Sequence, residues 1–173
     1  MRRLTCLVAM TCLLCPTLLA QEKNPVAAAL RELLSARAKN IVAAAEEMPA
    51  DKYGFKATPE QMTFGHLAVH IFEANYLFCS KIGGVAAPEL PKLSDTDAKD
   101  KLVERMKASF DFCSTALAKL DDSNLNETLT LSSERKTSRA MATLIFAGAM
   151  GDHYSIEAMY LRLNGHLPPT AKK

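Results

Sequence analysis

Two strongly helical runs that carry histidines constrain this chain more than any other feature. Residues 151–169, GDHYSIEAMYLRLNGHLPP, contain His153 on a run that ends at an Asn-Gly pair and is closed by two prolines. Residues 62–80, MTFGHLAVHIFEANYLFCS, contain His66 and His70, one helical turn apart. Three of the four histidines therefore lie on two helices, where they could meet.

Apolar residues recur at steps of three and four along four stretches, which predicts helices. The expected helices span residues 24–47, 63–82, 95–120 and 137–164. Asn24 and Thr63 are the expected N-caps of the first two, and glycines stop the second. The 121–136 segment is polar with a short β-branched patch, and no strand pattern of useful length occurs. The fold class is all-α, a four-helix bundle with at least one long connection.

The pattern also predicts which side of each helix faces the core. On the second helix, His70 is expected half-inward and His66 at the edge of the apolar face. On the last helix, one face is expected to be lined by Met141, Leu144, Ile145, Gly148, Ala149, His153, Ile156 and Tyr160.

Residues 1–20 have the layout of a secretory signal peptide. Two arginines precede an apolar run that is too short to span a bilayer, and Ala20 is the expected last residue before the cut. A lipoprotein signal that uses Cys15 and a buried N-terminal helix are the alternatives. The interpretation places the protein outside the cytoplasm, secreted or periplasmic, with residues 21–173 as a single domain.

The charge of the whole chain belongs to that targeting segment. The formal net charge is +2, and residues 1–20 hold two basic and no acidic residues, so the charge of residues 21–173 is 0. No basic stripe with interleaved aromatic residues occurs, which argues against nucleic acid as a partner. No second long apolar run occurs, so we expect no membrane span in the mature form.

Two cysteines remain after the signal is removed, Cys79 and Cys113, each within a helical pattern. An even pair in an oxidising compartment favours a disulfide, provided that the two helices are neighbours. Two separate buried thiols are the alternative.

Three passages resemble the DinB-like superfamily of helical bundles, in particular its exported branch. They are MPADKYGFKATPEQMTFGHLAVHIFEANYLFCSKI, SFDFCSTALAKL and DHYSIEAMYLRLNGHLPP, and their order and spacing cover nearly all of the mature chain. The resemblance implies a DinB-type four-helix bundle, and it implies pairing of the cysteines on the second and third helices.

The resemblance also implies a divalent metal, nickel or zinc, held by three histidines. His70 matches the ligand of the second helix, and His153 matches the second of two ligands on the last helix. The first of those two should stand at position 149, where this chain has Ala149.

Three outcomes remain open for such a site. The metal site is lost; or His66 replaces the missing ligand, since it lies four residues before His70; or a carboxylate replaces it. The candidate carboxylates are Glu73, Asp152 and Glu157. The default interpretation of Asp152 and Glu157 is a solvated helix residue, and that of His166 a surface residue.

Two classes of function follow, and the sequence leaves open whether the protein is an enzyme. One is a metal-dependent transferase or hydrolase acting on a small molecule or a thiol, as the resemblance implies. The other is a non-catalytic secreted binding module that has lost the metal. A homodimer is a possible assembly for a bundle that exposes apolar helix edges. The substrate and the identity of the metal do not follow from these residues.

Overall fold

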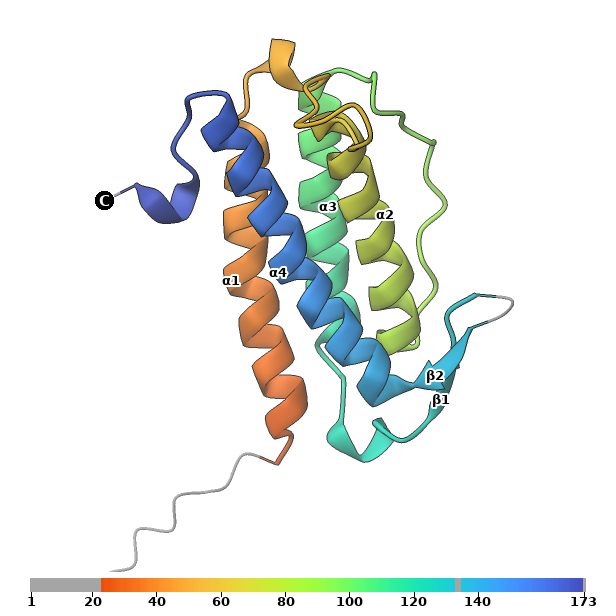
Figure 1. Ribbon diagram of the computed structural model, residues 1–173. Coiled ribbons are helices and arrows are strands. Elements are labelled where there is room, and N and C mark those ends of the chain that lie inside the picture. The colour runs from red at the N-terminus through yellow and green to blue at the C-terminus, as the bar shows by residue number, and fades with distance from the viewer. Residues whose placement is uncertain (1–22, 133–134, 173) are drawn as a thin grey trace, which may run out of the picture.

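Four long helices form the bundle, as the sequence predicts (Figure 1). The computed structural model describes residues 23–132 and 135–172, so the predicted signal peptide lies outside the described residues. The helices are α1 (Pro25–Glu47), α2 (Phe64–Gly83), α3 (Lys99–Leu117) and α4 (Arg139–Leu163). Short elements join or follow them: η1 (Ala50–Lys52), η2 (Asp122–Asn124), β1 (Thr128–Thr130), β2 (Lys136–Ser138) and η3 (Pro169–Ala171).

The direction of the helices explains the long connection. Figure 1 shows α1 and α4 running one way along the bundle and α2 and α3 running the other way. Because α2 and α3 are parallel, the chain between them, residues 84–98, must travel back along the length of the bundle.

A small hairpin stands where the sequence predicts only a polar loop. Strands β1 and β2 pair antiparallel, with Leu129 opposite Thr137. The β-branched patch at 128–131 is therefore part of a three-residue strand rather than of a loop. The hairpin leads into α4, whose first residue, Arg139, contacts both the residue before the hairpin and the end of α2. Arg139 donates to the Glu127 carboxylate at 2.7 Å and to the carbonyl oxygen of Lys81.

The predicted N-caps are confirmed at one helix and wrong at another. The Thr63 hydroxyl accepts from the backbone N–H of His66 at 2.9 Å, which caps α2. The Asn24 side chain does not cap α1. Instead, the carboxylate of Asp122, from the distant η2 turn, accepts from Val26 N and Ala27 N at 2.9 Å each. Asn24 Oδ1 accepts from Asp122 N at 3.0 Å and so holds that turn in place.

Helices α2 and α3 are joined by a disulfide and by a buried polar contact at the same offset in sequence. Cys79 and Cys113, which are 34 residues apart, form the disulfide expected from the sequence. Asn75 Nδ2 donates to Ser109 Oγ at 2.9 Å, also with a separation of 34. The equal offset fixes a parallel register, and both contacts are buried, so α2 has little freedom to rotate or slide.

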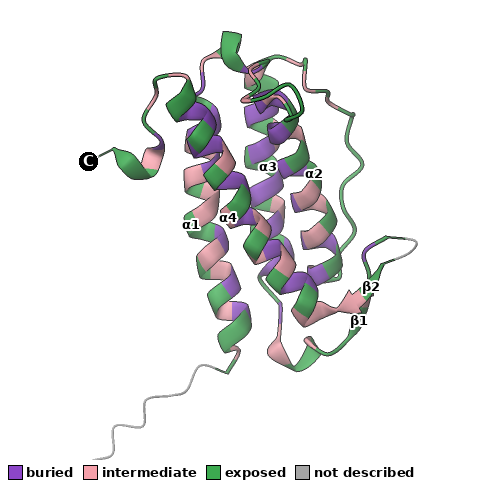
Figure 2. Ribbon diagram, in the orientation of Figure 1, coloured by how far each residue is buried: buried purple, intermediate pink, exposed green. Residues whose placement is uncertain are grey.

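The core-facing side of α4 differs from the predicted one. Figure 2 shows exposed residues along the outer side of this helix. Met141 is 50% exposed and Leu144 is 64% exposed, although both were expected inward. The residues of α4 that reach the core are Ala142, Thr143, Phe146, Met150, His153, Tyr154, Glu157, Ala158, Tyr160 and Leu161. The exposed apolar residues are compatible with the predicted homodimer, which stays a prediction.

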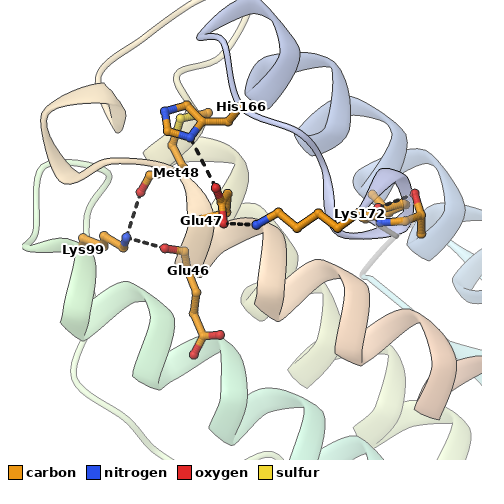
Figure 3. Close-up of polar contacts among 8 residues, drawn as sticks. Glu46, Glu47, Met48, Lys99, His166 and Lys172 are labelled. Atoms are coloured by element: carbon orange, nitrogen blue, oxygen red, sulfur yellow. Dashed lines mark hydrogen bonds and ion pairs between the residues drawn. The ribbon is translucent and has the colours of Figure 1, made fainter.

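The C-terminal segment closes the end of the bundle over the last turn of α1 (Figure 3). His166 Nδ1 lies 3.3 Å from the Glu47 carboxylate, and Lys172 donates to the same group. These contacts, with the Lys172 hydrogen bond as the largest effect, lower the pKa of Glu47. Lys99 Nζ donates to the carbonyl oxygens of Glu46 at 2.6 Å and Met48 at 2.8 Å, which satisfies two orphan acceptors at the helix end.

None of the helices in residues 23–132 and 135–172 is long and apolar enough to cross a membrane.

We expect the disulfide to contribute about 3–4 kcal/mol to the free energy of unfolding, since it closes a long loop in the unfolded chain. The double variant Cys79→Ala/Cys113→Ala should lower the urea midpoint accordingly, and reduced wild-type protein should match it. An oxidised protein no more stable than the double variant would contradict this assignment.

A candidate metal site between α2 and α4

His70 and His153 meet between α2 and α4, as the sequence predicts. Their ring centroids are 5.1 Å apart and the ring planes are nearly perpendicular, at 87°. Two turns further along α2, Phe78 stacks on Phe146 of α4 with centroids 5.8 Å apart. The two contacts belong to one antiparallel register, so the packing of these helices sets the distance between the imidazoles.

Hydrogen bonds of two tyrosines fix the rotation of α4 around its axis. On one flank, the Tyr154 hydroxyl accepts from Thr170 N at 3.0 Å and lies 2.8 Å from Thr170 Oγ1. On another, the buried Tyr160 hydroxyl donates to the carbonyl oxygen of Met62 at 2.8 Å. Because both residues lie within two turns of His153, they hold its side chain toward α2.

The two imidazoles have different environments. His70 is exposed, whereas His153 is only 9% exposed. The pKa of His153 is lowered to about 4, chiefly by burial and then by the neighbouring His70, and Asp152 partly offsets both effects. His153 is therefore neutral at ordinary pH and holds a lone pair that a metal ion can use without displacing a proton. Within the described residues, its ring makes no hydrogen bond that would compete.

The pair fits two of the donors that a metal site needs. Two imidazoles bound to one tetrahedral ion at about 2.1 Å have ring centroids about 5 Å apart, which agrees with the observed separation. A third protein donor is missing: among the described residues, no group of three or more His, Cys, Asp or Glu is arranged to hold a metal ion. Ala149, one turn before His153, offers a methyl group where the resemblance implies a ligand.

The other predicted site residues do not join the pair. His66 and Glu73 lie on α2 and are exposed, and Asp152 is exposed on α4. His166 is half-exposed at the end of the bundle and pairs with Glu47 there. His66 and Glu73 therefore remain predictions as ligands.

Glu157 is a candidate ligand whose surroundings differ from the expected ones. It was expected in solvent, but its exposed fraction is 0%, and neither carboxyl oxygen has a hydrogen-bond partner among the described residues. Burial raises the pKa of this carboxyl well above its usual value. The available signal was its spacing: Glu157 follows His153 by four residues, which places both on one side of α4. A side chain on that face is directed inward, whatever its polarity.

One groove lies away from the histidine pair. A groove of about 440 Å³ separates α1 from α3, and its walls include Arg31, Leu34, Phe110 and Ser114. None of the site residues predicted from the sequence lines it.

The fold and the histidine pair together define the class of protein. It is a four-helix bundle with a candidate site between its second and last helices. The sequence pattern of the DinB superfamily matches residues 33–156 of this chain. The match covers more than half of the chain, so the protein belongs to the DinB superfamily. Glu157 is the first residue beyond the matched range.

Solved structures support the same fold. A DinB-like protein from Bacillus subtilis aligns with a TM-score of 0.66 and 20% identity, covering 84% of this chain and 99% of that protein. A DinB-like protein from Bacillus cereus has a TM-score of 0.66 and 13% identity, covering 81% and 93%. No curated protein matches the chain. At these identities the likeness shows the fold alone.

We expect Glu157 to make the protein less stable as pH rises. The pKa of this carboxyl is raised above 4.5 in the folded state. As pH rises above 4.5, the carboxyl ionises in the unfolded chain but stays protonated in the folded chain, so the free energy of unfolding falls. The free energy of unfolding of Glu157→Gln relative to wild type should therefore rise by roughly 1 kcal/mol per pH unit from 4.5 up to the folded-state pKa. Denaturant titrations at pH 4.5, 6 and 7.5 measure this. An equal difference at all three values would show that the carboxyl ionises freely in the fold.

Proposed function

We propose that this protein is an exported DinB-superfamily bundle whose His70–His153 pair binds a divalent transition metal, nickel or zinc, together with a small molecule. The observation that carries the proposal is the pair itself, with centroids 5.1 Å apart between two packed helices. A bound metal would lower the pKa of a coordinated thiol or water and so supply a nucleophile near neutral pH. This is the chemistry of a metal-dependent transferase or hydrolase, with a thiol as the expected class of ligand.

The chain's own residues would prepare such a site. His153 offers a neutral nitrogen because burial keeps its pKa low. His70 is exposed and would be the imidazole nearer to an incoming ligand. Because position 149 holds only a methyl group, coordination positions stay available to the small molecule.

A second candidate function is a non-catalytic secreted module that has lost the metal. The observation that favours it is Ala149, together with the lack of a gathered third donor among the described residues. Two histidines alone bind metal weakly, since catalytic zinc sites use three protein ligands. The metal content of the protein separates the two candidates.

We expect protein purified without a histidine tag to bind one Zn²⁺ or Ni²⁺, and His70→Ala and His153→Ala to abolish this binding. His166→Ala is the matched control, because His166 lies at the end of the bundle. Ala149→His should tighten binding at least about tenfold, since it restores a third imidazole. Binding is measured by calorimetry and by metal analysis after dialysis.

His66→Ala decides whether His66 contributes, because it removes the other imidazole of α2. Absence of metal from wild type, together with unchanged stability of both histidine variants, would favour the non-catalytic module.

Export is the second part of the proposal. The layout of residues 1–20 supports it, and the buried disulfide suits an oxidising compartment. When the whole chain is expressed in a Gram-negative host, the periplasmic fraction should contain protein that begins at Gln21, as read by intact mass. Replacement of Leu13 and Leu14 by Arg should keep the full-length chain in the cytoplasm. Wild-type protein that stays full-length in the cytoplasm would contradict export.

A further inference from the structure

The groove between α1 and α3 is longer than its main part. The main part has a volume of about 440 Å³, and an adjoining part has a volume of about 310 Å³. The two parts share four lining residues, Ala38, Lys39, Phe110 and Asp111. They therefore form one continuous groove, the α1–α3 groove. Its lining residues belong to α1, to α3 or to Ala118 just after α3, so α2 and α4 contribute none.

Small side chains explain why this helix pair leaves a groove. Ser35 and Ala38 of α1 and Ser114 of α3 line it, and none of them is long enough to fill the space between two helix backbones. Leu34 and Phe110 also line the groove and are buried, so they form an apolar floor. An apolar concave surface of this volume with a few polar groups at its walls is typical of a small-molecule site.

Arg31 supplies a cation at one end of the groove. It is half-buried, and its Nη1 donates to the carbonyl oxygens of Leu117 and Leu120 at 3.4 Å each. In the part of the chain that the structure describes, the guanidinium forms no ion pair. Because both hydrogen bonds are long and use one nitrogen, the edge formed by Nε and Nη2 is free to bind a carboxylate through two hydrogen bonds.

The charges along the rest of the groove differ from those at this end. Lys39 and Asp111 have opposite charges, and neither forms an ion pair within residues 23–132 and 135–172. At the far end, Lys107 Nζ lies 2.6 Å from Glu46 Oε1, so these two charges neutralise each other. Arg31 and Lys39 minus Asp111 leave a net charge of +1. The groove is therefore complementary to a single negative charge at the Arg31 end and to an apolar chain beyond it.

We propose that the α1–α3 groove binds a fatty acid, that is, a monocarboxylic acid with a long apolar chain. The carboxylate lies on the free edge of the Arg31 guanidinium, and the chain runs over Leu34 and Phe110 toward Val42. Between Arg31 and Val42 the groove follows about 16 Å of α1, at about 1.5 Å per residue. This site is independent of the proposed metal site, because it uses no residue of α2 or α4.

The test is a calorimetric titration of the purified protein, with its disulfide intact, using three probes that share one chain. The probes are decanoate, decanol and decylammonium, each below the concentration at which it forms micelles. Decanoate should bind at least about tenfold more tightly than decanol, and decylammonium should bind most weakly, because only the carboxylate pairs with a guanidinium. Equal affinity for all three would show that the chain alone is recognised and would overturn the proposal.

Variants of Arg31 test the position of the carboxylate. Arg31→Gln should weaken decanoate binding at least about tenfold and leave decanol binding unchanged, because it removes the charge and the fork. Arg31→Lys keeps the charge without the fork and should give an intermediate affinity. Lys119→Gln is the matched control, since Lys119 is exposed and does not line the groove. Decanoate affinity that is unchanged in Arg31→Gln would refute the assignment.

A blocking variant keeps the test decisive if the Arg31 variants are unstable. Ser114 is exposed, and its hydroxyl makes no hydrogen bond among the described residues, so the fold should accept Ser114→Trp. The indole would fill the groove and should abolish binding of decanoate and decanol without changing the melting curve. His70→Ala and His153→Ala should bind decanoate as wild type does. Loss of binding in these two variants, with binding retained in Ser114→Trp, would assign the fatty acid to the histidine pair and overturn the proposal.

Discussion

The antiparallel contact between α2 and α4 fixes the position of every group at the candidate site. The Phe78–Phe146 stack and the His70–His153 contact lie along the same interface, so the helices cannot slide without separating both pairs. Helix α2 is in turn joined to α3 by a buried disulfide, which limits its rotation. The imidazoles are therefore held together by the packing of the bundle, and no flexible loop has to close to bring them into contact.

Features that depend on neighbours in sequence could be predicted, and features that depend on distant residues could not. Thr63 caps α2 because its partner is three residues away. Asn24 fails to cap α1 because Asp122, 95 or more residues distant, takes that place. Helix α3 begins at Lys99 rather than near residue 95, since the Asp97 carboxylate accepts from Ser94 N and forms a turn there. These differences follow from contacts that periodicity does not contain.

Helix α4 shows the limit of periodicity within one element. Its apolar residues occur on nearly every side, so the pattern selects no single inward face. The prediction therefore placed Leu144 inward, where the structure leaves it 64% exposed, and it left Glu157 in solvent, where the structure buries it completely. The hydrogen bonds of Tyr154 and Tyr160 to distant segments decide the rotation. The contact between His70 and His153 was expected from the resemblance, which matches each histidine to a ligand on its own helix, and the two rings do meet.

Positions 149 and 157 lie one helical turn before and one helical turn after His153 on α4. Ala149 is half-buried, whereas Glu157 is completely buried. The first position lacks the metal donor that the resemblance implies. The second carries a buried carboxyl without a hydrogen-bond partner among the described residues. Glu157 weakens the bundle, because burial without a partner favours the unfolded chain at neutral pH.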